Sequence, residues 1–292
     1  MTEKKKLYAR INSFLDRVEH LLPRQENIDF DTGIAWQWRT DKYSSGLRLI
    51  PRVSPISLDD LQHVDKQKSL LVRNTQQFLA GLPANNALLW GPRGTGKSSL
   101  VKAILNEFGD QGLKLIEVER DYLVDLPSII DSIAEADPKQ QNRFVIFCDD
   151  LSFDEKDTTY RALKVVLDGS VLSTPDNIII YATSNRRHLV PEKLSDNQDA
   201  KFDSDGEIHQ SEAVEERISL SERFGLWVSF HPFNQARYLN IVTHWLEHFG
   251  ETLSDEARHA ALQWALLHGS RSGRSAQQFA RDWVGQQRLT KN

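Results

Sequence analysis

One short segment constrains this chain more than any other: the eight residues GPRGTGKS from Gly91 to Ser98. They match the phosphate-binding pattern G-x-x-x-x-G-K-[ST] at every fixed position. Glycines in this pattern let the backbone wrap closely around a phosphate group, with its N–H groups pointing inward. The lysine then reaches the β- and γ-phosphates of a nucleotide, and the hydroxyl group coordinates Mg²⁺. The alternative is a glycine-rich turn that holds no ligand.

The sequence on both sides of this segment supports a phosphate site. An apolar, strand-sized run at 87–90 precedes it, and a helical pattern follows through about residue 108. A helix that begins near Lys97 directs its positive N-terminal end at the phosphates. We therefore predict that the chain binds ATP and Mg²⁺, with Lys97 on the phosphates and Ser98 on the metal ion. The expected nucleotide-binding residues of the loop are Gly91, Pro92, Arg93, Gly94, Thr95, Gly96, Lys97, Ser98 and Ser99.

Strand-like and helical segments alternate along the middle of the chain. Continuous apolar runs occur at 87–90, 113–118, 144–148, 178–182 and 226–230. Helical patterns cover 66–80, the stretch from the phosphate loop to about 108, 125–136 and 157–168. This alternation predicts crossover units and a parallel sheet whose strands are covered by helices on both faces. The expected fold class is therefore α/β, a P-loop parallel sheet flanked by helices.

The residues after Pro232 follow a different pattern. Three helical segments at about 234–249, 254–268 and 274–288 predict a small, all-helical lid subdomain. Three domains are therefore expected: an N-terminal helical and irregular extension over 1–62, an α/β nucleotide-binding domain over 63–232 and a helical lid over 233–292.

Two polar or irregular regions lie outside this framework. Residues 1–22 are predicted to form an amphipathic helix, and residues 23–60 are expected to be irregular. Trp36 and Trp38 alternate with polar residues as in a strand, and we expect them to anchor this region to the larger body; stacking on nucleic-acid bases is the alternative. The acidic segment 191–210 is expected to be a solvated loop, with a partner-binding or gating loop as the alternative.

A Mg-nucleotide site also requires an acidic residue at the end of a buried strand. The apolar run 144–148 is followed by Asp149 and Asp150. We predict that Asp149 holds Mg²⁺, directly or through water, and that Asp150 polarises the attacking water. Taken alone, two aspartates after a strand are weak evidence, because loops often begin this way. Beside a phosphate loop they become informative.

Further candidates for the site follow later in the chain. Asn185, after the run 178–182, could hold the lytic water, or be an ordinary turn residue at a strand end. Arg217 and Arg223 precede the last strand, and Arg223 in particular could reach the γ-phosphate of a neighbouring subunit. A surface ion pair with a nearby glutamate is the alternative. Arg274 could bend back to the γ-phosphate of its own subunit, or be a solvated arginine at a helix start.

In this order, the motifs resemble those of the AAA+ ATPases. The order is Walker A (Gly91–Ser98), Walker B (Phe144–Asp150), sensor 1 (Asn185), an arginine box (Arg223) and a helical lid with sensor 2 (Arg274). More closely, the chain is similar to a group of bacterial AAA+ proteins with no assigned function, over about residues 30–285. The stretches 83–86, 147–153 and 182–189 carry this similarity. The resemblance implies an AAA+ fold and ATP chemistry, and it names no substrate.

The resemblance also implies an oligomeric ATPase, in a ring or filament of identical subunits, that remodels or loads an unidentified protein or nucleic-acid partner. One alternative is a nucleotide-gated binding module that hydrolyses ATP slowly, and another is a small-molecule kinase. The usual AAA+ Walker B ends in Asp-Glu, so the shorter Asp150 favours slow hydrolysis. The segment Arg120–Leu123 lacks the aromatic–aliphatic–glycine pore loop of protein unfoldases, which argues against polypeptide threading.

Composition narrows the location and partner only slightly. The 292 residues carry a net charge of −5 with both signs mixed, which gives no global electrostatic case for nucleic-acid binding. Cys148 is the only cysteine, and no apolar run is long enough to span a bilayer, so we expect a cytoplasmic protein without a membrane span. The segment His244–His248 has the H-x-x-E-H spacing of some zinc peptidases. An ordinary amphipathic helix explains it better, because no third ligand is evident.

Overall fold

The computed structural model describes residues 8, 10, 11, 28–40, 44–153, 159–168, 175–187, 189, 201, 202, 208, 209 and 220–291. The helix predicted over 1–22 lies almost entirely outside these residues, as do most of the acidic segment 191–210 and Arg217. Within the described residues, seven strands form one sheet, and two short strands, β7 (Lys201–Phe202) and β8 (Ile208–His209), form a second.

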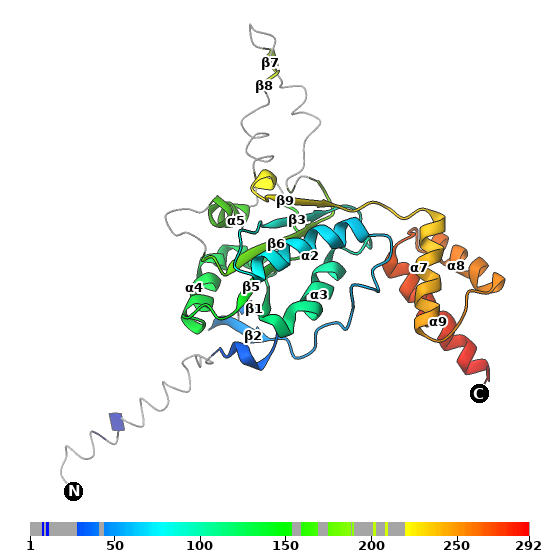
Figure 1. The fold of residues 1–292 in the computed structure, drawn as a ribbon, viewed down its shortest axis with the longest axis horizontal. Coiled ribbons are helices and arrows are strands. Elements are labelled where there is room, and N and C mark those ends of the chain that lie inside the picture. The colour runs from blue at the N-terminus through cyan, green and yellow to red at the C-terminus, as the bar shows by residue number, and fades with distance from the viewer. Residues whose placement is uncertain are drawn as a thin grey trace.

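The main sheet has the strand order β2-β1-β4-β5-β6-β3-β9 (Figure 1). Its strands are β1 (Ala35–Thr40), β2 (Ser45–Leu49), β3 (Ala87–Trp90), β4 (Leu113–Glu117), β5 (Arg143–Cys148), β6 (Ile178–Ser184) and β9 (Leu226–Ser229). Edge strand β2 pairs antiparallel with β1, and every other neighbouring pair is parallel. The prediction of an α/β parallel sheet is therefore confirmed, with one antiparallel strand added at the edge.

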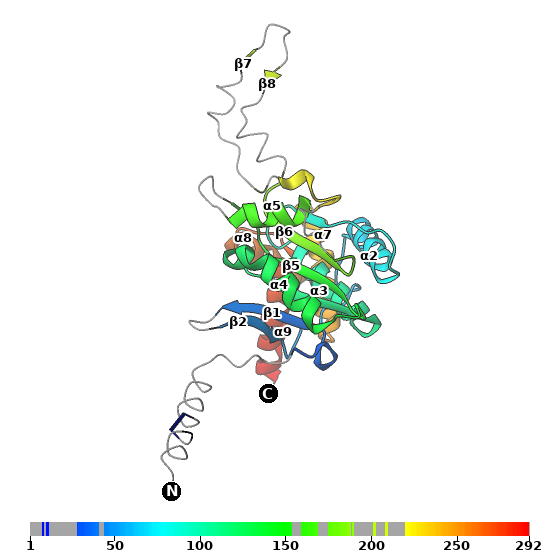
Figure 2. The same cartoon turned by 90° about the vertical axis from the view of Figure 1, so that its left-hand side faces the viewer.

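Helices cover both faces of this sheet, which explains why its central strands are continuously apolar. One face carries α2 (Asp65–Leu79) and α3 (Lys97–Phe108), and the other carries the 3-10 helix η3 (Arg120–Asp125), α4 (Leu126–Ala136) and α5 (Thr159–Asp168) (Figure 2). In β5, Val145 and Phe147 pack into the cluster with α2 and α3, whereas Phe144 and Ile146 pack into the cluster with α4 and α5. Each such burial contributes about 1.5–3 kcal/mol.

The region expected to be irregular contains two strands of the main sheet, so this expectation is wrong for β1 and β2. Trp36 and Trp38 occupy alternate positions of β1 and are both buried in the cluster with α4 and α5. Trp36 packs edge-on against Phe30, and the Trp38 Nε1 donates a hydrogen bond of 3.0 Å to Asp125. Both tryptophans thus anchor this region to the larger body, as expected. The sheet begins before residue 62, earlier than the sequence division placed it.

Three helices follow the sheet and form the lid: α7 (Gln235–His248), α8 (Asp255–Leu267) and α9 (Gly273–Lys291). Side chains of Asn234 and Ser254 cap the first two helices by accepting hydrogen bonds from the amides of Arg237 and Ala257. The helices pack together at one end of the sheet (Figure 1). Within the described residues, every helix lacks the long apolar stretch that a membrane span requires.

Candidate nucleotide-binding site

The phosphate loop begins where β3 ends and leads directly into α3. The amide of Gly91 donates to the carbonyl oxygen of Ser184 (3.1 Å), which fastens the loop to the end of β6. Gly91 and Gly94 have φ angles of 141° and 75°, in the region that favours glycine. A Cβ atom on Gly91 would lie 2.2 Å from the carbonyl oxygen of Phe230, and one on Gly94 would lie 2.5 Å from Cβ of Ser272. The two glycines are therefore required by close packing as well as by backbone conformation.

Lys97, the first residue of α3, directs its side chain back into the loop. Its Nζ donates hydrogen bonds to the carbonyl oxygens of Gly91 (2.6 Å) and Pro92 (2.9 Å) and to Oδ1 of Asn185 (3.1 Å). Only 6% of Lys97 is exposed. The loop, the start of α3 and the end of β6 therefore meet at one ammonium group.

The burial of Lys97 favours a bound anion beside its ammonium group. Burial lowers the pKa of the Lys97 ammonium group, and the nearby cations Arg93 and Arg274 act in the same direction, while Asp150 and Asp149 oppose them. Because burial is the largest of these effects, an anion bound beside Lys97 would stabilise its charged form. Lys97, Arg93 and Arg274 all line the same cleft, so the structure brings together the three cations that the sequence analysis assigned to the nucleotide.

Ser98 and Asp149 meet on the other side of Lys97. Ser98 Oγ donates a hydrogen bond of 2.6 Å to Asp149 Oδ1, and the same oxygen accepts one of 2.5 Å from Thr183 Oγ1. Carboxylate and hydroxyl oxygens are the protein ligands that Mg²⁺ prefers, often completed by water and phosphate oxygens. The Ser98–Asp149 pair therefore fits Mg²⁺. Sequence analysis missed Thr183, because only Asn185, the last polar residue of this stretch, was given a role.

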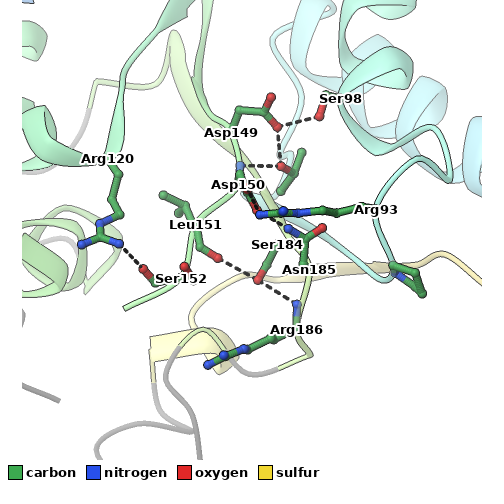
Figure 3. A network of polar contacts seen from close by, with 12 residues as sticks. Arg93, Ser98, Arg120, Asp149, Asp150, Leu151, Ser152, Ser184, Asn185 and Arg186 are labelled. Atoms are coloured by element: carbon green, nitrogen blue, oxygen red, sulfur yellow. Dashed lines mark hydrogen bonds and ion pairs between the residues drawn. The ribbon is translucent and has the colours of Figure 1, made fainter. Parts of the chain in front are cut away.

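Asp150 and Asn185 form a second contact beside this pair (Figure 3). Asp150 has φ 53°, and its amide donates to Thr183 Oγ1 (2.8 Å), which fixes the backbone after β5. Its carboxylate accepts one hydrogen bond from Asn185 Nδ2 and another of 3.0 Å from Arg93 Nη2. Asn185 therefore bridges Asp150 and Lys97. Through Thr183, the structure connects five predicted residues in one hydrogen-bond network: Lys97, Ser98, Asp149, Asp150 and Asn185.

A cleft of about 450 Å³ lies between the sheet domain and the lid. Its polar side is formed by the phosphate loop, including Ser99, with Asp149, Asp150 and Asn185. Its apolar side is formed by Ile56, Leu61, Val64, Phe233, Ile241 and Trp245. Sequence analysis missed this apolar side, since its residues come from the segment before α2 and from the lid and meet only in the folded chain. A cleft with one anion-binding side and one apolar side suits a nucleotide with its phosphates and base.

Arg274 lies at the edge of this cleft, where the lid meets the phosphate loop. The amide of its neighbour Gly273 donates a hydrogen bond of 2.8 Å to the carbonyl oxygen of Gly94. Arg274 is exposed and lines the cleft. The lid is also joined to the segment before α2, through a contact of 3.2 Å between His244 Nε2 and Asp60 Oδ1.

Arg223 lies apart from these residues. Its Nε donates to the carboxylate of Asp168 at the end of α5, and among the residues described Arg223 does not line the cleft of its own chain. In the parallel pairing of β9 with β3, Leu226 lies opposite Ala87, whereas the phosphate loop follows the other end of β3. Arg223 precedes β9 and therefore lies near the amino-terminal ends of the parallel strands, whereas the phosphate loop lies at their carboxyl-terminal ends.

The His244–His248 segment, with its zinc-peptidase spacing, and Cys148 both have packing roles. In the described part of the chain, no group of three or more His, Cys, Asp or Glu side chains is arranged to hold a metal ion. His244 contacts Asp60, and the ring of His248 packs edge-on against those of Trp245 and Phe249. Cys148 is fully buried, and burial followed by the charge of Asp149 raises the pKa of its thiol to about 12, so the thiol stays protonated.

The sheet order, the phosphate loop between β3 and α3, the paired acids after β5 and the C-terminal helices define an AAA+ P-loop fold. The chain belongs to the family described as "Protein of unknown function (DUF815)", whose model matches residues 31–287. The family resemblance drawn from the motifs is thereby confirmed at the level of fold and class.

In sequence, the chain is similar to the Replication factor C large subunit of Aeropyrum pernix, with 26% identity over 144 residues, 49% of this chain and 30% of that protein. The corresponding subunit of Ignicoccus hospitalis is 37% identical over 73 residues, 24% of this chain and 15% of that protein. The chain thus matches less than a third of the length of these curated relatives.

Solved structures show the same fold. The Thermotoga maritima RuvB Holliday junction branch migration motor is 16% identical, with a TM-score of 0.53, over 82% of this chain and 67% of that chain. The Aeropyrum pernix ORC1 protein, solved in complex with DNA, is 13% identical, with a TM-score of 0.50, over 77% and 61% of the two chains. At such low identity the similarity shows the fold alone.

Proposed function

We propose that this chain is an oligomeric Mg-ATPase that couples ATP hydrolysis to the remodelling or loading of a macromolecular partner. The observation that carries this proposal is the convergence of Ser98, Asp149, Asn185 and Lys97 at the phosphate loop, through hydrogen bonds of 2.6–3.1 Å. These residues come from three separate elements, and no packing requirement explains why their polar groups meet beside an open cleft. ATP binding does explain it.

Each residue has a specific role in this proposal. Lys97 and the amides of the loop bind the β- and γ-phosphates, Arg274 contacts the γ-phosphate from the lid, and Ser98 and Asp149 hold Mg²⁺. The metal ion, when bound, neutralises charge on the phosphate oxygens. Asn185 orients the attacking water, and Asp150 accepts a hydrogen bond and finally the proton from it. The water oxygen bonds to the γ-phosphorus as the bond to the ADP oxygen breaks.

Arg223 suggests that the site is shared between subunits. Arg223 lies at the end of the strands away from the phosphate loop, too far to reach the phosphates of its own chain. In a head-to-tail oligomer, this end of one chain would face the cleft of the next chain. A guanidinium group supplied in this way stabilises the charge that develops on the transferred phosphoryl group. The proposed oligomer is therefore a ring or filament, in which Arg223 acts only in the neighbouring site.

The class of partner is proposed from the relatives. A branch migration motor and a protein solved on DNA share this fold, and the relatives found by sequence are named Replication factor C large subunit. We propose a protein or nucleic-acid partner for this chain on that ground. The net charge of −5 implies that any nucleic acid would be held by a local surface rather than by the whole molecule.

A second function is favoured by one observation, namely that the short side chain of Asp150 is held in an ion pair with Arg93. In this alternative the chain is a nucleotide-gated binding module that hydrolyses ATP slowly. The two functions are separated by measuring ATP binding and steady-state turnover as a function of protein concentration. Turnover per subunit that rises with concentration supports the oligomeric ATPase, whereas tight binding with negligible turnover at every concentration supports the binding module.

A further inference from the structure

Two asparagines, Asn85 and Asn86, lie directly before β3, at the same end of the parallel strands as Arg223. In the pairing of β3 with β9, Ala87 lies opposite Leu226, so the residues before Ala87 lie beside those that follow Arg223 (Figure 1). Among the described residues that line the nucleotide cleft, neither asparagine is found. Their polar contacts therefore need an explanation other than ATP binding in their own chain.

Asn86 joins the strands on both sides of β3. Its side-chain Oδ1 accepts a hydrogen bond of 2.8 Å from the amide of Ile180 in β6. Its main-chain carbonyl oxygen accepts one of 3.1 Å from the amide of Leu226 in β9. Since Leu226 is the third residue after Arg223, Asn86 fastens the segment that follows the arginine to the inner strands of the sheet.

Asn85 is held by α2 and packs against Gly225. Its amide donates a hydrogen bond of 3.0 Å to Oδ1 of Asn74, and its carbonyl oxygen accepts one of 2.9 Å from Nδ2 of the same side chain. Because Asn74 is buried in α2, these two bonds fix the backbone of Asn85. A Cβ atom added to Gly225 would lie 2.3 Å from Oδ1 of Asn85. The Asn85 side chain is therefore in direct contact with the second residue after Arg223.

The residue next to Arg223 is restrained as well. Phe224 is buried in the cluster with α4 and α5, and its carbonyl oxygen accepts a hydrogen bond of 2.8 Å from Trp227 Nε1. All three residues that follow Arg223 are thus held, whereas Arg223 itself is partly exposed. A side chain that acts on the phosphate of another subunit must be presented at one place, and a restrained backbone provides this.

We propose that Asn85 and Asn86 are positioning residues that hold Arg223 in place for the nucleotide of a neighbouring subunit. The inference rests on the proposed sharing of the site between subunits. It assigns both asparagines to the subunit that supplies the arginine and not to the subunit that holds the ATP.

The test is the steady-state ATPase rate of the full chain carrying Asn86→Ala, alone and in one-to-one mixtures. Asn86→Ala removes the hydrogen bond to β6 and loosens the segment after Arg223. Because a misplacement of about 1 Å can cost about a hundredfold in rate, we expect Asn86→Ala alone to lose about tenfold or more in kcat. Its Kd for ATP should equal that of wild type, because its own cleft lies at the other end of the strands.

The mixtures show which subunit carries the defect. With Lys97→Ala, about a quarter of the sites combine the Lys97 of an Asn86→Ala chain with a well-placed Arg223 from its neighbour, so about a quarter of the wild-type rate should return. With Arg223→Ala, no chain supplies a well-placed arginine, and the mixture should be no more active than Asn86→Ala alone. Recovery with Arg223→Ala but not with Lys97→Ala would place the defect in the variant's own nucleotide site and overturn the proposal.

Asn85→Ala repeats the test with a substitution that the fold should tolerate. The Asn85 side chain is exposed, and both of its main-chain bonds to Asn74 remain in the variant. Only the contact with Gly225 is lost, so we expect kcat to fall about threefold or more, with the same pattern of recovery in the two mixtures. Wild-type kcat in Asn85→Ala together with loss of folding in Asn86→Ala would overturn the proposal, because Asn86 would then be needed for folding alone.

Asn177 provides a matched control for Asn86. It is buried just before β6, and its Nδ2 donates a hydrogen bond of 3.3 Å to the carbonyl oxygen of Asn142. Asn177→Ala also removes one bond between a side chain and the main chain, but away from the segment after Arg223. It should leave kcat within about twofold of wild type, because residues without a shared partner act nearly independently. Equal losses in Asn177→Ala and Asn86→Ala would show a general weakening of the sheet and overturn the proposal.

Two further results separate this proposal from the function on which it rests. Asn86→Asp keeps the accepting oxygen and should retain most of the turnover. If the mixture of Lys97→Ala with Arg223→Ala recovers activity while Asn85→Ala and Asn86→Ala both keep the wild-type kcat, only the present inference fails. If that reference mixture stays inactive, the shared site fails and the inference fails with it.

Discussion

The main-chain amide of Gly273, the first residue of α9, donates a hydrogen bond of 2.8 Å to the carbonyl oxygen of Gly94 in the phosphate loop. The lid and the loop are thus in direct backbone contact at the cleft. On the other side of the same junction, a Cβ atom on Gly94 would lie 2.5 Å from Cβ of Ser272. The position of the lid and the conformation of the loop therefore depend on each other.

The first prediction concerns Gly94→Ala. The added methyl group would collide with Ser272 and separate the lid from the loop, so we expect the Kd for ATP to rise about tenfold or more, equivalent to about 1.4 kcal/mol. Gly250→Ala is the matched control, because Gly250 has a similar φ of 80° and no atom within 4 Å of an added Cβ. It should lose about 1 kcal/mol of unfolding free energy and keep its ATP affinity. Equal ATP affinities for the two variants would show that the lid–loop junction does not affect binding.

A second prediction concerns Thr183, whose hydroxyl group joins the two aspartates by donating to Asp149 and accepting from the amide of Asp150. Thr183→Val keeps the shape and removes both hydrogen bonds in a buried position, so we expect a loss of about 1–3 kcal/mol in unfolding free energy and lower ATP turnover. Thr183→Ser retains the hydroxyl group and should preserve most of the unfolding free energy and of the ATP turnover. Denaturant unfolding and steady-state kinetics measure the two effects, and a valine variant as active as the serine variant would contradict this role.

The third prediction tests the metal site by removing the metal. Chelation of Mg²⁺ should weaken ATP binding to the wild type, whereas Asp149→Asn should bind ATP weakly and with little dependence on Mg²⁺. Loss of such a carboxylate lowers metal affinity by about tenfold or more. Asp121→Asn, which removes an exposed carboxylate outside the cleft, should behave as wild type. If Asp149→Asn retained the full dependence on Mg²⁺, Asp149 would not be a ligand.

A fourth prediction follows from the contact between Asp60 and His244. Burial raises the pKa of Asp60, but hydrogen bonds from the amide and hydroxyl group of Ser57 and from His244 outweigh it, so the net pKa lies below its usual 3.8. A carboxyl group with a lowered pKa stabilises the folded chain above its unfolded-state pKa and loses this contribution as the pH falls through its folded-state value.

We therefore expect Asp60→Asn to unfold more easily than wild type at pH 7, with the difference shrinking as the pH falls below 3.8. Unfolding free energies measured over this range check the prediction. A difference that stayed constant down to pH 2 would show that the charge of Asp60 contributes nothing to stability.

Sequence analysis predicted those parts of the site that are each encoded in a short, continuous segment of the chain. The phosphate loop and Asp149 each follow an apolar strand, and the position of a residue after such a strand defines its place in a parallel sheet. The apolar side of the cleft could not be predicted, because Leu61 and Trp245 are far apart in the chain and neither belongs to a nucleotide-binding motif. The two residues line the same cleft only once the lid has folded back onto the sheet domain.

The strands β1 and β2 were missed for a different reason. Their exposed faces carry polar residues, and Pro51 and Pro55 follow closely, so the segment looked irregular as a whole. The alternation of Trp36 and Trp38 was the correct signal for a strand. It was weak because β1 covers the core with one face while β2 forms the edge of the sheet.

Arg223 needs a control before its role in a neighbouring subunit can be tested, because it forms an ion pair with Asp168 in its own chain. Asp168→Ala breaks this pair and keeps the arginine. If Arg223 acts on a neighbour's nucleotide, Asp168→Ala should retain most of the turnover, while Arg223→Ala should lose about 10³-fold, as expected for an arginine that stabilises phosphoryl transfer. Comparable losses in both variants would assign Arg223 a structural role instead.

The most direct test of the central claim is the ATPase rate of a one-to-one mixture of the Lys97→Ala and Arg223→Ala chains. Each variant alone should be nearly inactive. In a mixed oligomer with head-to-tail contacts, about a quarter of the sites combine an intact Lys97 with an intact Arg223 from the neighbour, so the mixture should recover about a quarter of the wild-type rate. A mixture as inactive as its two components would contradict a site shared between subunits.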